Sequence, residues 1–222
     1  SPDLISFSTE EAAAAEQAGI DTMKVRFDPL NPDSAAAIRR AAPNTFMAFS
    51  VPLVAAVSPE EAVRLGYQAM QLGADAIMCQ WSPRFVAAAA EAGIPVQGHA
   101  GLVPRKSTWT GGLRAVGKTL DEALWIYEEI KALERAGAYA VEVEVIPEEL
   151  LVEISKRTSL LTSSIGSGGG GDDDKANGRM TATTVTGAVM ATVMSTVVTT
   201  AVAVVMVITV ASDVKVIVGG DR

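Results

Sequence analysis

The chain contains only one cysteine and one histidine, Cys79 and His99, among its 222 residues. A single cysteine excludes an intrachain disulfide and a metal cluster built on several thiolates, and it is compatible with a reducing compartment. Basic residues are also few, since 18 lysines and arginines against 26 acidic residues leave a net charge of −8. We therefore expect no nucleic-acid partner, because nucleic-acid-binding proteins carry a basic surface.

The sequence also lacks a secretory signal pattern, and its long uncharged segment is not typical of a membrane helix. Its first residues do not show a basic segment followed by an apolar one, the arrangement of a secretory signal peptide, so we expect a cytoplasmic protein. Residues 180–212 carry no charge and are long enough to cross a bilayer. Because valine and threonine dominate this segment and no aromatic residue flanks it, we favour buried strands or an aggregation-prone tail over a membrane helix.

Short apolar segments alternate with segments of helical pattern through the first three quarters of the chain. The expected strands are residues 4–7, 22–27, 45–49, 76–79, 94–98, 140–146 and 160–165. An alanine–glycine or glycine–alanine pair precedes several of them, which is typical of repeated strand–helix units and a parallel sheet. We predict an α/β fold, a (β/α)8 TIM-type barrel that is either complete, incomplete or irregular in its C-terminal part, with an open doubly wound sheet as the alternative.

The composition changes after the seventh expected strand. We expect residues 1–166 to form barrel units one to seven, and residues 167–179, rich in glycine and aspartate, to form a linker or loop. Residues 180–222 form a third segment, rich in valine and threonine, whose structure the pattern does not define. Residues 166–171, which are glycines except for Ser167, match no known phosphate-binding pattern, so a flexible loop is favoured over a phosphate site.

The segment at residues 93–104 is the most informative, because it holds His99. A short apolar run predicts a buried strand, and Gly-His-Ala-Gly is expected to form a turn directly after it. Alpha/beta folds place their chemistry just past the carboxyl ends of their strands. His99 is therefore a candidate to bind a substrate oxygen, or alternatively a structural residue that anchors its loop.

Alternation in the sixth expected strand places two carboxylates on one face. Glu142 and Glu144 alternate with valines, which should face the helices and leave both carboxylates pointing into the barrel. Desolvation raises the pKa of a carboxyl group, so Glu144 is a candidate general base. An edge strand with two hydrated carboxylates is the alternative.

Other candidates end the earlier strands. Asp28 follows the second strand, where it could bind a hard metal ion or form a turn in a proline-rich loop. Ser50 follows the third strand. Cys79 ends the fourth and is more typical of a small buried apolar residue than of a nucleophile. Arg105, Lys106 and Arg114 form a basic loop that could meet an anionic substrate or simply be hydrated.

Several phrases of the chain resemble the ketopantoate hydroxymethyltransferase family, also called 3-methyl-2-oxobutanoate hydroxymethyltransferase. They are residues 42–46, 58–62, 93–104, 112–119, 131–138 and 144–149. The most specific are Gly-His-x-Gly-Leu-x-Pro and the later Glu-x-x-Pro that begins at Glu144. The resemblance spans about residues 3–168, and it implies a barrel of the phosphoenolpyruvate mutase/isocitrate lyase superfamily.

What this resemblance implies is a transferase of pantothenate biosynthesis. Such an enzyme would use Mg²⁺ and 5,10-methylenetetrahydrofolate to add a hydroxymethyl group to the enolate of a 2-oxo acid such as 2-oxoisovalerate. Glu144 falls on the family's general base, His99 on its substrate-binding histidine and Asp28 on one of its two metal-binding aspartates. The resemblance also implies a homo-oligomer.

The chain departs from the family pattern at several of these positions. Ser50 stands in place of the second metal-binding aspartate, and is expected to contact substrate instead. Residues 78–80 replace the family's Lys-x-Glu, and Pro29 replaces a serine. One carboxylate and one serine would hold magnesium weakly. Two alternatives therefore stay open: a C–C lyase or aldolase of the same superfamily, and a non-catalytic barrel homologue.

Overall fold

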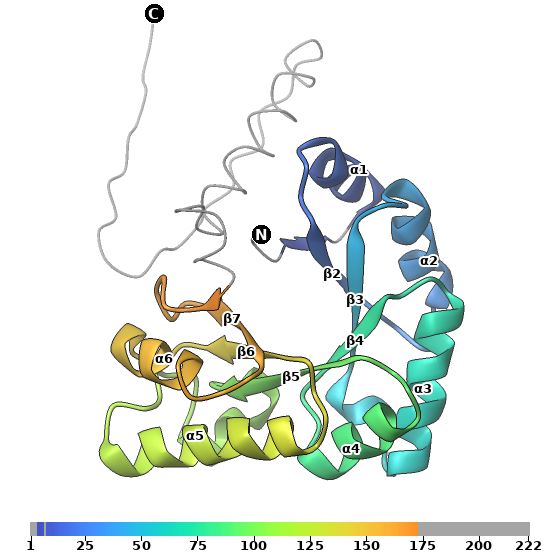
Figure 1. The fold of residues 1–222 in the computed structure, drawn as a ribbon. Coiled ribbons are helices and arrows are strands. Elements are labelled where there is room, and N and C mark those ends of the chain that lie inside the picture. The colour runs from blue at the N-terminus through green and yellow to red at the C-terminus, as the bar shows by residue number, and fades with distance from the viewer. Residues whose placement is uncertain (1–3, 7, 173–222) are drawn as a thin grey trace, which may run out of the picture.

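Seven parallel strands form one curled sheet in the computed structural model, which describes residues 4–6 and 8–172 (Figure 1). Each strand pairs with the next one in the sequence. The strands are β1 (Leu4–Ser6), β2 (Thr22–Arg26), β3 (Phe46–Val51), β4 (Ala76–Cys79), β5 (Val96–Gly101), β6 (Ala140–Glu144) and β7 (Leu161–Ile165). This order confirms the barrel-type prediction, because a doubly wound sheet would reverse its strand order at one point.

Helices cover the outer, convex face of the sheet (Figure 1). They are α1 (Thr9–Gln17), α2 (Pro32–Ala41), α3 (Pro59–Gln71), α4 (Pro83–Glu91), α5 (Leu120–Arg135) and α6 (Glu148–Ser155), with short 3-10 helices η1 (Leu53–Ala55) and η2 (Pro104–Thr110). Side chains close their first turns as the sequence indicates: Ser8 and Glu11 form a capping box that begins α1. Within the described residues, none of these helices has the length and apolar character needed to cross a membrane.

The barrel is incomplete in the part of the chain that the structure describes. There β1 and β7 are the two ends of the strand order rather than neighbours. The inner face is correspondingly open at the amino ends of the strands, where a cavity of about 670 Å³ is lined partly by Leu161, which is 60% exposed. Of the expected linker, only residues 167–172 are described. Residues 173–222, including the whole valine-rich segment, lie outside the described residues.

Alternation separates the two faces of the sheet as predicted. In β6 the side chains of Val141 and Val143 are fully buried in the core between sheet and helices. Glu142 and Glu144 alternate with them and lie on the concave face. The edge-strand alternative is wrong for β6, because this strand pairs with β5 on one side and β7 on the other.

β5 extends three residues further than the sequence suggested, so His99 lies inside the strand rather than in a turn after it. His99 pairs with Glu142, and Gly101 pairs with Glu144. The glycines serve packing instead of a turn: a Cβ on Gly98 would come within 2.8 Å of Leu133 on α5. The strand ends only at Gly101, whose φ of +83° is the left-handed conformation that glycine adopts readily. β3 also runs longer than expected and includes Ser50.

Candidate functional site

A cluster of charged side chains and the single histidine lies on the concave face of the sheet. Lys24 comes from β2, His99 from β5, and Glu142 and Glu144 from β6. The register places His99 opposite Glu142, and Glu142 opposite Ser163 of β7. Because all strands are parallel, side chains at matching heights on neighbouring strands meet in one layer of the barrel.

The side chains of His99 and Glu144 lie in direct contact on the concave face. The imidazole Nε2 lies 3.0 Å from Glu144 Oε2. The contact is not aligned as a hydrogen bond, and Nε2 has no hydrogen-bond partner among the described residues. The His99 side chain is 2% exposed, whereas that of Glu144 retains 17% exposure. Glu144 is therefore less deeply buried than expected for a side chain inside a barrel. It can contact both His99 and a bound molecule.

The other ring nitrogen of His99 is held by two side chains. Nδ1 lies 3.3 Å from Nε2 of Gln80 and 3.5 Å from Oε1 of Glu142. If the Gln80 amide donates to Nδ1, the ring proton resides on Nε2 and faces Glu144. If Nδ1 carries the proton toward Glu142, Nε2 becomes an acceptor. The imidazole can thus present either a donor or an acceptor to a substrate.

Lys24 and Glu142 form a buried ion pair across the cluster. Their side chains are only 3% and 4% exposed, and Lys24 Nζ also lies 3.5 Å from Ser163 Oγ. The ammonium group of Lys24 compensates the buried carboxylate of Glu142. The two glutamates therefore differ in their partners. Glu142 forms an ion pair with Lys24, whereas Glu144 contacts the imidazole of His99.

The backbone around Glu144 is unusually constrained. Val145, the residue directly after it, has a φ of +49°, which is rare for a β-branched residue. The N–H of Val145 donates to the carbonyl of Ile165, and the N–H of Leu102 donates to the carbonyl of Glu144 at 2.8 Å. A Cβ on Gly101 would lie 2.5 Å from that same carbonyl oxygen. Strain of this kind concentrates at functional sites and fixes the direction of the neighbouring side chain.

The structure groups three metal-ligating side chains but does not include Asp28 among them. His99, Glu142 and Glu144 offer ligand atoms within 4.8 Å of one another, so they could hold a metal ion. Imidazole with carboxylates suits transition metals, whereas Mg²⁺ prefers oxygen ligands. Asp28 is exposed, and its Oδ1 accepts the N–H of Leu30 at 2.9 Å in a turn. The group of His99, Glu142 and Glu144 is a poor match for magnesium because it includes an imidazole. The metal role of Asp28 stays a prediction.

Of the remaining sequence candidates, Cys79 and the glycine loop occupy structural positions, whereas the substrate contact of Ser50 stays a prediction. Cys79 is fully buried, and burial raises the pKa of its thiol to about 12, which excludes a thiolate nucleophile at neutral pH. Ser50 is partly buried and pairs with Arg26 on β2. In the glycine loop, the N–H of Gly169 donates to the Glu148 carboxylate at 3.1 Å, so a side chain of the same protein already uses this donor.

Sequence reasoning missed the contribution of Lys24 and understated that of Gln80. Lys24 lies between two apolar residues of a short strand, where a lone charge facing the inside of a barrel requires a partner. The available signal was Glu142, an opposite charge that also lies between apolar residues of a strand and could serve as the partner of Lys24. Lys24 and Glu142 are 118 positions apart, and only the curvature of the sheet brings them together.

The sequence pattern of the family described as ketopantoate hydroxymethyltransferase matches residues 9–175, which is most of the chain. The chain belongs to this family. Among curated relatives, each named 3-methyl-2-oxobutanoate hydroxymethyltransferase, the protein of Deinococcus radiodurans is 39% identical over 138 residues, covering 60% of this chain and 49% of the relative. That of Kosmotoga olearia is 31% identical over 185 residues, covering 74% of this chain and 69% of the relative.

This ketopantoate hydroxymethyltransferase family member spans about half the length of the curated relatives first matched, 52% for that of Ignicoccus hospitalis. Solved structures show the same fold at low identity. 2,3-Dimethylmalate lyase, a PEP mutase/isocitrate lyase superfamily member, matches with a TM-score of 0.53 at 13% identity, covering 90% of this chain and 81% of that one. A candidate lyase/mutase from Burkholderia cenocepacia matches with a TM-score of 0.62 at 12% identity, covering 90% and 83%.

Proposed function

We propose that this chain carries the proton-abstraction site of a hydroxymethyltransferase that acts on a 2-oxo acid such as 2-oxoisovalerate. The observation that carries the proposal is the 3.0 Å contact between His99 Nε2 and Glu144 Oε2 on the concave face, near the carboxyl ends of β5 and β6. Family membership supports the reaction class. It also supports methylenetetrahydrofolate as donor, assembly into a homo-oligomer and a cytoplasmic location, which belong to the same proposal.

Each side chain of the cluster has a defined role in this reaction. Glu144 accepts the proton from the carbon next to the ketone, because it is partly exposed and Lys24 does not neutralise it. The electron pair of the broken C–H bond moves into an enolate, whose oxygen accepts a hydrogen bond from the Nε2–H of His99. The same carbon then forms the new C–C bond to the methylene carbon of methylenetetrahydrofolate as one C–N bond of the donor breaks. A water molecule supplies the hydroxyl oxygen as the second C–N bond breaks, and the two folate nitrogens take up the proton from C3 and one from water, which releases tetrahydrofolate.

Gln80 and the Lys24–Glu142 pair position the imidazole for this role. Gln80 donates to Nδ1, which keeps the ring proton on Nε2, and Glu142 lies on the same side of the ring. Asp28 and Ser50 together supply only one carboxylate, so they would hold magnesium weakly. A metal bound in the family manner would polarise the 2-oxo group and add to the effect of His99.

Deuterium exchange tests the proposed proton abstraction directly. 2-Oxoisovalerate is incubated with the full chain in D₂O with magnesium present, and loss of the proton at C3 is followed by NMR. We expect exchange that Glu144→Gln abolishes and that Glu149→Gln leaves unchanged, since Glu149 is an exposed carboxylate on the neighbouring helix. Equal exchange rates in both variants would rule out Glu144 as the base.

Adding the donor distinguishes the remaining alternatives. Formation of ketopantoate from 2-oxoisovalerate and methylenetetrahydrofolate supports the transferase. Exchange without any effect of folate favours a lyase or aldolase that works through the same enolate. Absence of exchange in the wild-type chain favours a non-catalytic homologue.

A further inference from the structure

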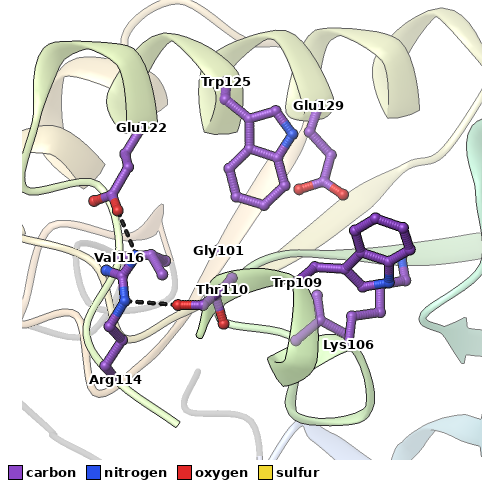
Figure 2. Close-up of a pocket in the computed structure, with 10 residues that line it drawn as sticks. Gly101, Lys106, Trp109, Thr110, Arg114, Val116, Glu122, Trp125 and Glu129 are labelled. Carbon is purple, nitrogen blue, oxygen red and sulfur yellow. Dashed lines mark hydrogen bonds and ion pairs between the residues drawn. The ribbon is translucent and has the colours of Figure 1, made fainter. Parts of the chain in front are cut away.

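A second cavity, of about 530 Å³, lies between α5 and the segment from η2 to Val116 (Figure 2). Its size is that of a small-molecule site. Two tryptophans and several charged residues line it; the full lining is Gly101, Val103, Lys106, Trp109, Thr110, Arg114, Val116, Glu122, Trp125 and Glu129. Nothing in the proposed chemistry of the concave face uses these side chains.

Glu129 is the residue that indicates a ligand. Its Oε2 is buried and has no hydrogen-bond partner among the described residues. Burial raises the pKa of this carboxyl group, against the opposing charges of Lys106 and His99. A buried acceptor without a partner is costly, and a bound molecule that donates an N–H would satisfy it.

The other charged groups of the cavity divide into paired and unpaired ones. Arg114 donates to Glu122 at 2.6 Å and to the carbonyl of Thr110 at 2.7 Å, so this corner is internally satisfied. Lys106, within the described part of the chain, has no side-chain hydrogen bond or ion pair. The carboxylate of Glu129 and the ammonium of Lys106 attract each other without forming a direct ion pair, so the cavity offers both groups to a ligand.

The two indoles add a flat apolar surface. Trp109 is 91% exposed and Trp125 is 48% exposed, which is unusual for the largest apolar side chain. Figure 2 shows Trp125 and Glu129 on successive turns of α5, facing Trp109 and Lys106 on η2 across the hollow. Indole faces stack on planar aromatic rings, and this geometry is worth more than the buried area alone.

We propose that this cavity binds a planar nitrogen heterocycle that stacks against the indoles, donates N–H groups to Glu129 and places an anionic substituent near Lys106. The inner end of the cavity reaches the proposed chemistry: Gly101 pairs with Glu144, and the N–H of Val116 donates to the carbonyl of Val145 at 3.1 Å. The folate donor has this chemistry, with a ring rich in N–H groups and an anionic tail. Naming folate as the ligand rests on the proposed function.

Binding of tetrahydrofolate to the full chain, measured by titration calorimetry, tests this assignment. We expect Glu129→Gln to weaken binding about tenfold or more, because one charged hydrogen-bond acceptor is lost. Trp125→Leu should weaken it as well, through loss of stacking. Glu128→Gln is the matched control, since Glu128 is exposed on the same helix, and its binding should equal that of the wild type.

Pterin-6-carboxylate, which carries the ring and an anionic group without the tail, is the second probe. Binding of this probe that Lys106→Met weakens supports the arrangement in the cavity. Unchanged tetrahydrofolate affinity in both Glu129→Gln and Trp125→Leu, with thermal melting curves like the wild type, would overturn it. If the wild-type chain exchanges the C3 proton of 2-oxoisovalerate but binds neither probe, this assignment is wrong and the proposed function stands; if exchange is also absent, both are wrong.

Discussion

Lys24 and Glu142 pair with each other across the concave face, one from the second strand and the other from the sixth. The pair has two consequences for the neighbouring chemistry. It compensates a carboxylate that would otherwise lie buried and charged, and it leaves Glu144 as the carboxylate beside His99. A charge pair at this place therefore assigns different roles to two glutamates separated by a single valine.

Removing one partner of this pair should cost far more stability than removing both. We expect Lys24→Met to lower the free energy of unfolding by about 3–5 kcal/mol, because Glu142 would be left buried without a cation. The double variant Lys24→Met, Glu142→Leu should recover much of that loss. Urea denaturation of the wild type, both single variants and the double variant measures the coupling, and a double variant as unstable as the sum of the singles would contradict it.

His99→Gln should slow exchange of the C3 proton of 2-oxoisovalerate by about 10²-fold or more, since the enolate oxygen loses its donor. The Gln80→Leu variant should slow it less and change its pH dependence, because the ring proton is no longer directed to Nε2. Exchange rates across pH 5 to 9 for both variants provide the measurement. A Gln80→Leu profile that matches the wild type would show that Gln80 does not position the ring.

Gly101→Ala should be more destabilising than Gly19→Ala, although both glycines have φ near +80°. A Cβ at Gly19 meets nothing within 4 Å, so only the backbone conformation is strained, at about 1 kcal/mol. A Cβ at Gly101 would lie 2.5 Å from the carbonyl oxygen of Glu144 and force the two strands apart. Thermal unfolding compares the two, and equal losses would mean that β5 and β6 adjust freely there.

Glu134 makes part of the stability depend on acid pH. Hydrogen bonds from Lys131 and then Ser159 lower the pKa of this carboxyl group to about 2, from an ordinary value of 4.5. A lowered pKa in the folded state means that the contribution is complete above pH 4.5 and disappears as the pH falls toward 2. Glu134→Gln should therefore lower stability at pH 7 and make little difference near pH 2. Denaturation at both pH values checks this, and a loss that is equal at both would exclude the ionised carboxylate as its source.

Patterns local in the sequence predicted much of the fold. The capping box at Ser8 and the alternation around Glu142 both depend on residues a few positions apart, and the structure shows both. The extent of β5 was not predictable from such patterns. Its glycines suggest a turn, but the close approach of Leu133 from α5 makes glycine the residue that an ordered strand requires there.

The candidate site was predictable only in part for a related reason. Glu144 and His99 stand out by their residue types and by the phrases around them. Lys24 and Glu129 do not, because a lysine in a strand and a glutamate on a helix are common, and their significance comes from partners supplied, or not supplied, by distant segments. Burial and pairing across the barrel are tertiary properties that no spacing rule contains.

The left-handed backbone of Val145 is strained, and this strain holds the neighbouring Glu144 carboxylate in a fixed direction. Glycine adopts this conformation readily, so Val145→Gly would relieve the local backbone strain. The added backbone freedom would also let the Glu144 carboxylate move away from the His99 imidazole. Slower turnover without a gain in stability is the expected outcome, because glycine also loses the packing of the Val145 side chain against the core and adds freedom to the unfolded chain. Valine at this position therefore keeps the Glu144 carboxylate beside His99 in spite of a strained backbone.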